Sequence, residues 1–231
     1  MAVKKGDFIK LNYTGSADGI IFDTTSEAVA KENGTHADGK KYEPIVICIG
    51  AGQVIPGLDE ALEGNEIGKE YTIDIPEDKA YGPRDNSLYK SVSTKEFKEK
   101  PTVGTRVSAD GRTGVVVNIV GKRAVIDFNH MLAGKALNYK YTIESVVEDK
   151  VEQAKAVFKL FMAKDFEMEL NNGTLTIVLP PGITYDQRWM MGKGMATFQI
   201  FDTIDGIEEI VMKETFKKPA KDAETAPVVE A

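Results

Sequence analysis

Apolar and polar residues alternate in several segments of the first half of the chain. This period-two pattern, typical of a strand with one buried face, occurs at residues 9–13, 71–75 and 139–143. The continuous apolar run 45–49 predicts a strand buried on both faces. These segments predict a sheet. The polar run 24–41 between them predicts a long loop.

A different spacing predicts one short helix in this half. Pro56 suits a helix start, where a missing N–H group removes no hydrogen bond. Leu58, Ala61 and Leu62 then lie on one helical face, and Gly64 favours a helix end.

The composition changes after Gly82. Residues 83–129 contain nine Lys and Arg and five Asp and Glu, so their net charge is 9 − 5 = +4. The whole chain carries −7, which leaves −11 for the rest. Two β-prone runs, 115–120 and 124–128, flank a Gly-Lys turn and predict a hairpin. We therefore interpret residues 83–129, called the insert below, as a small β unit inserted into the first domain.

The C-terminal segment, residues 151–217, has its own pattern. Helical spacing at 151–161 and 185–201 predicts two helices, and the Asn-Asn-Gly sequence at 171–173 predicts a hairpin within 166–179. A last strand is predicted at 207–216. The alanine-rich residues 218–231 lack periodicity and predict a disordered tail.

The second predicted helix has three interpretations. Its apolar residues are Trp189, Met190, Met191, Met195 and Phe198. A helix core is the favoured one, because the residues have helical spacing. An adaptable binding surface is the second, since thioether side chains repack around varied partners. A dimer interface is the third.

Composition restricts the class of protein. The chain has 231 residues, of which 42% are hydrophobic and 28% charged, enough apolar material for a core. A net charge of −7 argues against a nucleic-acid binder, because binding to phosphates needs a basic surface. The charged start of the chain predicts no signal peptide, and no apolar run approaches the length of a membrane span. We expect a cytoplasmic protein.

Few residues are available for metal or nucleophilic chemistry. The single cysteine, Cys48, forms no internal disulfide, and only His36 and His130 add nitrogen ligands. A metal site, a cofactor and a Ser-His-Asp triad are therefore not expected. Gly50-Ala51-Gly52 follows a predicted strand, but Ile55 stands where a dinucleotide loop has its third glycine.

The remaining informative residues are mostly apolar and aromatic, and most of them suit core positions. Tyr13, Asp23 and Tyr81 differ because they bring polar groups into this apolar set. Buried polar atoms need hydrogen-bond partners, so these three residues mark a candidate site.

Several short motifs resemble the FKBP-type peptidyl-prolyl isomerases. They are Leu11-Asn12-Tyr13-Thr14-Gly15, Gly19-Ile20-Ile21-Phe22-Asp23, Gly50-Ala51-Gly52-Gln53-Val54-Ile55-Pro56-Gly57-Leu58, and Ala80-Tyr81-Gly82. After about 45 residues, Asn129-His130-Met131-Leu132-Ala133-Gly134 follows, which resembles the SlyD-like branch with its insert-in-flap chaperone domain. The C-terminal segment resembles the long archaeal members of this family by architecture alone.

The resemblance implies an α+β fold. An antiparallel sheet would wrap on a short helix in residues 1–82 and 130–150, with the insert as a small β domain in the flap. Residues 151–217 would form an additional C-terminal α+β domain.

The resemblance also implies a site. Tyr13, Asp23 and Tyr81 would be the catalytic residues, with Tyr81 donating a hydrogen bond to a substrate carbonyl. Asp23 would lie at the rim and either interact with Tyr13 or accept CH contacts from the rotating group. Substrate-binding residues would be Phe22, Ile47, Val54, Ile55, Leu58, His130, Leu132, Leu137 and Tyr139. Many family members have Trp where Leu58 stands and an aromatic where Ile47 stands. These smaller residues predict a wider or shallower cavity and weaken the expectation of tight macrolide binding.

The predicted function is isomerisation of X–Pro bonds in unfolded or partly folded polypeptides, assisted by the insert as a chaperone. The positive charge of the insert suits acidic or flexible chain segments, but it also fits a solvated face. The alternative is a holdase or interaction module with a vestigial pocket, although all three polar residues of the site are present. A homodimer through the C-terminal domain is a further prediction. No nucleic-acid or membrane partner is expected.

Overall fold

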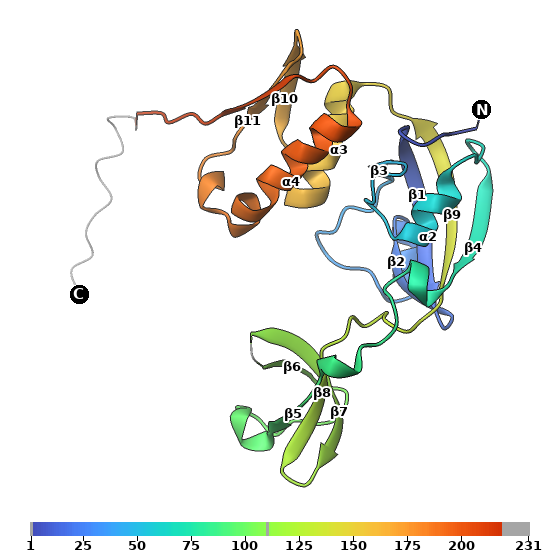
Figure 1. Ribbon diagram of the computed structural model, residues 1–231, viewed down its shortest axis with the longest axis vertical. Coiled ribbons are helices and arrows are strands. Elements are labelled where there is room, and N and C mark those ends of the chain that lie inside the picture. The colour runs from blue at the N-terminus through green and yellow to red at the C-terminus, as the bar shows by residue number, and fades with distance from the viewer. Residues whose placement is uncertain (1, 110, 219–231) are drawn as a thin grey trace. The chain divides into compact units, whose positions relative to one another are not determined.

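The computed structural model describes residues 2–109 and 111–218 and has the predicted α+β architecture (Figure 1). By its internal contacts the chain divides into two compact units. The first contains the described residues up to Lys4, Leu11–Pro44 and Val54–Glu144, and the second contains Lys5–Lys10, Ile45–Gln53 and the described residues from Ser145 onward. The predicted tail lies, apart from Lys218, outside the described residues.

The main sheet has the strand order β2-β1-β9-β4, and β3 pairs with β1. Its strands are β1 (Phe8–Ala17), β2 (Ile20–Thr24), β3 (Ile45–Cys48), β4 (Glu70–Ile75) and β9 (Leu137–Val146). Burial alternates along β4 and β9 as the period-two pattern predicts. Helix α2 (Pro56–Leu62) buries Leu58 and Leu62, and the short helix η1 (Glu77–Lys79) follows β4.

One predicted loop is partly helical. Residues 24–41 contain helix α1 (Glu27–Glu32), so the prediction of a continuous loop was wrong there. Ser26 caps the helix by accepting a hydrogen bond from the Val29 N–H group, and Glu27 pairs with Lys31 one turn later. A single buried residue, Ala30, anchors it, which is too little apolar periodicity to detect in the sequence.

The insert forms its own antiparallel sheet with the order β5-β8-β7-β6. Its elements are η2 (Asn86–Leu88), β5 (Tyr89–Ser93), η3 (Thr94–Glu96), β6 (Arg106–Ala109), β7 (Arg112–Val120) and β8 (Arg123–Asp127). The hairpin predicted around Gly121 and Lys122 is confirmed as β7 and β8. The buried core of this sheet consists of Val116, Ala124 and Ile126.

The C-terminal segment contains two helices and a three-stranded sheet of order β10-β11-β12. The elements are α3 (Lys150–Met162), β10 (Glu167–Asn171), β11 (Thr174–Val178), η4 (Ile183–Tyr185), α4 (Gln187–Thr203) and β12 (Glu209–Lys213). The hairpin predicted around Asn171-Asn172-Gly173 is confirmed: Asn171 pairs with Thr174, and the two turn residues Asn172 and Gly173 have positive φ angles of 47° and 84°. Strand β12 returns parallel to β11.

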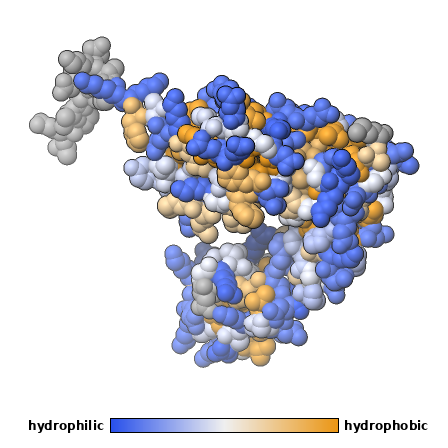
Figure 2. All heavy atoms as spheres, turned by 45° about the horizontal axis from the view of Figure 1, so that its top comes forward, coloured by the Kyte–Doolittle hydropathy of each residue, from blue (hydrophilic) through white to orange (hydrophobic). Residues whose placement is uncertain are grey.

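Helix α4 corrects the favoured interpretation of its apolar residues. Trp189 is buried, but Met190, Met191, Met195 and Phe198 are 60–72% exposed. The core interpretation was therefore wrong for these four residues. The buried face of α4 instead contains Trp189, Gly192, Ala196 and Ile200. On the face in view, Figure 2 shows hydrophobic atoms interspersed with hydrophilic surface.

Candidate functional site

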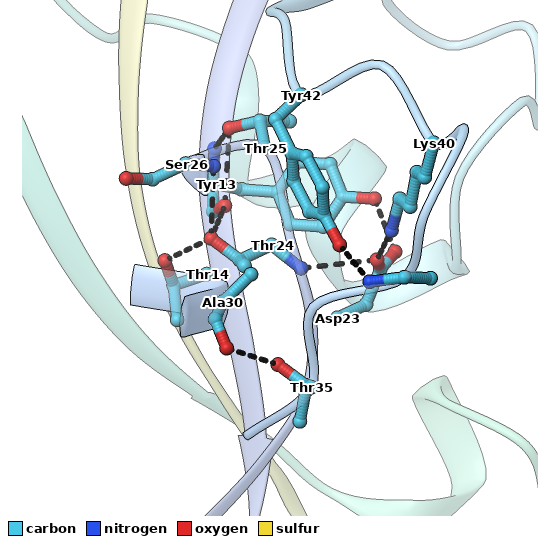
Figure 3. Close-up of polar contacts among 11 residues, drawn as sticks. Tyr13, Thr14, Asp23, Thr24, Thr25, Ser26, Ala30, Thr35, Lys40 and Tyr42 are labelled. Atoms are coloured by element: carbon cyan, nitrogen blue, oxygen red, sulfur yellow. Dashed lines mark hydrogen bonds and ion pairs between the residues drawn. The ribbon is translucent and has the colours of Figure 1, made fainter. Parts of the chain in front are cut away.

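Tyr13 and Asp23 form the polar centre of the candidate site. They lie on the adjacent strands β1 and β2, whose antiparallel pairing places Gly15 opposite Asp23. The Tyr13 hydroxyl donates to Asp23 Oδ2 at 2.6 Å, and the Asp23 Oδ1 atom accepts from the Thr24 N–H group at 3.0 Å (Figure 3). The backbone N–H group of Tyr13 donates in turn to the Thr25 hydroxyl at 3.0 Å. The structure thus brings together two residues that the sequence predicts to be catalytic.

A third residue of this network, Lys40, is absent from the sequence-based prediction. Its Nζ atom lies 2.7 Å from Asp23 Oδ1, and in Figure 3 it reaches the carboxylate from the loop after α1. Tyr42 orders this loop: its hydroxyl accepts from the Ala37 N–H group at 2.9 Å, and Lys40 lies over its ring. The ring of His36 also stacks on the Tyr42 ring, with 5.3 Å between the two centroids. No spacing rule predicts that a polar loop returns its lysine to Asp23.

An aromatic wall stands beside the Tyr13–Asp23 pair. The ring of Tyr139, from β9, lies 5.8 Å from the ring of Tyr13 and 5.9 Å from that of Phe22 between centroids. Gly15 permits this approach, because a Cβ atom at its position would stand 2.7 Å from the Phe22 ring and 3.1 Å from Tyr139. A larger residue at position 15 would displace both rings.

The electrostatics of the site keep its phenols protonated. Burial raises the pKa of Tyr13, and the hydrogen bond to Asp23 raises it further. Burial also raises the pKa of Tyr139 and of Tyr81, and in both cases the negative charge of Asp23 adds to the effect. At neutral pH all three hydroxyl groups therefore remain hydrogen-bond donors.

Tyr81 and His130 lie at the two ends of the insert. Their rings stack with 4.0 Å between centroids, and the Gly134 N–H group donates to the Gly82 carbonyl at 2.8 Å. Tyr81 is 39% exposed. The Leu132 N–H group donates to His130 Nδ1, which fixes the ring of the histidine.

The predicted apolar residues of the pocket are placed as follows. Leu58 on α2, Leu137 on β9 and Leu132 after the insert are buried, whereas Val54 and Ile55 are half-buried at the start of α2. Ile47 is fully buried on β3, in the second compact unit. That these six residues line one pocket with the aromatic wall stays a prediction.

A cavity of about 530 Å³ borders the network and shares some of its residues. Tyr13, Thr25 and Tyr42 contribute to it, but Phe22, Asp23 and Tyr81 do not. Its carboxylates are engaged: Glu27 pairs with Lys31, Glu70 pairs with Lys140, and Glu144 accepts from the Asn12 side chain. This cavity is distinct from the predicted apolar pocket.

Neither a metal-binding cluster nor a membrane-spanning helix occurs in the part of the chain that the structure describes. Over 2–109 and 111–218, no group of three or more His, Cys, Asp and Glu side chains is arranged to hold a metal ion. Within the same residues no helix is long and apolar enough to cross a membrane.

Comparison with known families accounts for most of the chain. Residues 1–99 match the family described as FKBP-type peptidyl-prolyl cis-trans isomerase. Residues 91–132 match the FKBP26 IF domain, and residues 150–217 match the FKBP26 C-terminal family.

Individual relatives agree with these matches. The short-type peptidyl-prolyl cis-trans isomerase of Methanocaldococcus jannaschii is 37% identical over 147 residues, which are 62% of this chain and 94% of that relative. The FKBP-type isomerase SlyD of Treponema pallidum is 36% identical over 105 residues, which are 43% of this chain and 60% of the relative. SlyD of Haemophilus influenzae is 28% identical over 160 residues, which are 66% and 77% of the two chains.

Proposed function

This chain belongs to the family of FKBP-type peptidyl-prolyl cis-trans isomerases, and on that premise we propose that X–Pro bonds rotate against the aromatic wall beside Asp23. The observation that supports this site is the arrangement of Tyr13, Phe22 and Tyr139 around a carboxylate whose two oxygens are both engaged. An apolar wall with protonated donors at its edge suits an amide that is losing its resonance.

The reaction itself makes and breaks no covalent bond. Rotation about an X–Pro bond is slow because amide resonance imposes a barrier of about 18–20 kcal/mol. The twisted amide is less dipolar than the planar one, so a water-poor, apolar surface stabilises it relative to the planar ground state. The enzyme has to hold the proline ring while the preceding carbonyl turns.

The residues of the network divide this task. The Asp23 carboxylate accepts from Tyr13, Lys40 and the Thr24 N–H group, so its role is to hold Tyr13 rather than to transfer a proton. Tyr81 is partly exposed and its hydroxyl stays protonated, so this hydroxyl donates to a substrate carbonyl. Val54, Ile55 and Leu58 form the floor under the proline ring.

The insert serves as a second binding surface for unfolded polypeptides. Val103, Val117 and Val120 are exposed on it, beside an excess of positive charge. Two weak sites on one chain raise the effective concentration of a bound segment at the other site. Chaperone action by the insert is therefore part of this proposal.

The first experiment measures X–Pro exchange in a short peptide by NMR. The wild-type protein at catalytic amounts should accelerate exchange. Asp23→Leu should lose most of that acceleration, because it removes the carboxylate that accepts from the Tyr13 hydroxyl and pairs with Lys40. Glu70→Leu is the matched control, since it removes an exposed carboxylate that also pairs with a lysine, Lys140. If the folded wild-type protein left exchange unchanged, the alternative of a holdase with a vestigial pocket would replace this proposal.

A second experiment tests the insert. Replacing Pro83–Asn129 with a short flap should leave exchange in a short peptide intact and slow proline-limited refolding of a whole protein. Equal loss on both substrates would contradict the two-site account.

The exposed residues of α4 support a homodimer as a second proposal. Met190, Met191, Met195, Phe198 and Phe201 are 49–72% exposed on one helix. Substituting Met191 and Phe198 by Glu should convert a dimer to a monomer in light scattering, whereas Lys155→Glu on α3 should not. A wild-type protein that is monomeric at all concentrations would refute the dimer.

Three predictions about location and partners rest on sequence alone. They are a cytoplasmic location, no nucleic-acid partner and no membrane partner, and they stay predictions.

A further inference from the structure

The second compact unit contains both the C-terminal segment and strand β3. Val46 and Cys48 pack into the same apolar cluster as Phe158 of α3 and Ile200 of α4. Successive side chains of a strand point to opposite faces, so Ile47 lies on the other face of β3. One face of this short strand is therefore covered by the C-terminal helices, while the opposite face presents a predicted residue of the isomerase pocket.

Helix α4 also contacts the loop after β3 with a directed hydrogen bond. The Gln199 Nε2 atom donates to the Ala51 carbonyl at 3.0 Å. Two residues later, Gln53 accepts from the Cys48 N–H group through its Oε1 atom at 2.8 Å. The loop is thus tied to α4 at its middle residue, Ala51, and to β3 through its last residue, Gln53, and it continues directly into Val54 and Ile55.

We propose that Gln199 is a positioning residue of the isomerase, which fixes the loop Ile49–Gln53 and through it the start of the pocket floor at Val54 and Ile55. This inference rests on the proposed function of the pocket. It gives the C-terminal segment a part in catalysis without contact between that segment and the substrate.

The two glutamines are more constrained than ordinary surface amides. Each uses one side-chain atom on a backbone group, which sets the orientation of its amide. The remaining atoms, Gln53 Nε2 and Gln199 Oε1, are buried and have no hydrogen-bond partner among the residues that the structure describes. Burying an unsatisfied oxygen costs free energy, and the hydrogen bond to Ala51 offsets that cost.

The test uses Gln199→Met, which keeps the volume and removes the donor. The matched control is Gln153→Met on α3, because the Gln153 Nε2 atom makes the same type of bond, at 2.7 Å, to the Val147 carbonyl. Both variants should be compared as full-length proteins for peptide exchange, thermal unfolding and backbone amide chemical shifts.

We expect Gln199→Met to lower kcat/KM for a short X–Pro peptide by about two- to tenfold, the range of one neutral hydrogen bond. The amide resonances of Val54 and Ile55 should shift. Gln153→Met should change neither kcat/KM nor the resonances of Val54 and Ile55. The unfolding temperature should fall by about the same amount in both variants, because each loses one hydrogen bond from a side chain to the backbone.

Two results would overturn the inference. One is wild-type catalysis with unshifted Val54 and Ile55 resonances in Gln199→Met. The other is an equal loss of catalysis in the Gln153→Met control, which would indicate general destabilisation. If the wild-type protein itself were inactive, the proposed function would fail, and the chemical shifts would still decide whether Gln199 positions the loop.

Discussion

The insert and the C-terminal segment are two additions to the isomerase fold, and they are built in different ways. The insert has a core of three fully buried residues, Val116, Ala124 and Ile126, all from its own strands. The C-terminal segment has a much larger core, which also contains Phe8 of β1 and Cys48 of β3. Burial of apolar surface dominates stability. The insert is therefore stabilised by a small core of its own, whereas the stability of the C-terminal segment depends on residues that it shares with β1 and β3.

This difference predicts how far a perturbation spreads. A change in the insert core should remain within the insert, since no strand of the main sheet contributes to that cluster. A change in the C-terminal core should reach β1 and β3, which supply residues to it. The single tryptophan, Trp189, is buried in the C-terminal core and reports on that region by fluorescence.

The largest effect is expected from Phe158→Ala. Phe158 is fully buried and packs against Phe166 and Trp189, with ring centroids 5.5 and 6.4 Å away. Loss of the ring should lower the free energy of unfolding by about 3–5 kcal/mol. In a denaturant titration, Trp189 fluorescence and isomerase activity should be lost at one lower midpoint. Two separate midpoints would contradict the shared core.

The matched change in the insert is Ile126→Ala. Ile126 is fully buried, and its loss should destabilise the insert by about 2–5 kcal/mol. Amide hydrogen exchange should accelerate in β5, β7 and β8, whereas the Trp189 midpoint and exchange in a short X–Pro peptide should not change. A lower Trp189 midpoint would show that the insert is coupled to the C-terminal core.

Acid should distinguish the two regions by a smaller effect. Burial raises the pKa of Asp127, but hydrogen bonds from Asn129 and the charge of Arg84 outweigh it, so the pKa lies below its usual value. Asp127 therefore stabilises the insert above the pKa of an unfolded Asp, about 3.9, and this contribution is lost as pH falls through the lower folded value.

The expected order of acid unfolding follows from the two cores. The hydrogen bond from Lys164 lowers the pKa of Asp186, which caps α4, so acid also weakens the C-terminal unit. That unit has the larger core, so NMR signals of the insert should broaden at a higher pH than Trp189 fluorescence changes. Asp127→Asn should remove most of this difference. If the NMR signals of the insert and the Trp189 fluorescence of the wild-type protein changed at the same pH, this order of unfolding would be refuted.

The smallest effect is expected from Tyr81→Phe, at the base of the insert. The substitution keeps the stack on His130 and removes only the hydroxyl group. Catalysis of peptide exchange should fall by about 0.5–1.5 kcal/mol of transition-state stabilisation, the net contribution of one neutral hydrogen bond. His130→Ala is the complementary variant, since it removes the stack and keeps the hydroxyl. Full activity of Tyr81→Phe would remove Tyr81 from the proposed site.

Local patterns predicted much of this molecule. The alternating strands β4 and β9, the hairpins at Gly121 and Asn172, and helix α2 each depend on neighbours in sequence, so their periodicity is visible there. Tyr13 and Asp23 were also predicted, because the motifs that carry them resemble a known family. Their direct hydrogen bond confirms that they lie together.

Long-range contacts account for what the patterns did not show. Lys40 lies in a polar loop with no periodicity, and its pairing with Asp23 depends on how Tyr42 orders that loop. The apolar residues of α4 have helical spacing whether or not a partner covers them, so spacing alone favoured a core that the structure places elsewhere on the helix.

The sequence by itself determined most of the strands, the main helices, several turn positions and the family, because these follow from short-range periodicity and short motifs; strands β5 and β6 of the insert were not predicted. Only the tertiary structure decided that Lys40 holds Asp23, that Phe8 and Cys48 belong to the C-terminal core, and that Gln199 binds the Ala51 carbonyl. Such contacts join residues far apart in the chain. They depend on which surfaces the packed elements bring together, and no local pattern of residues encodes that.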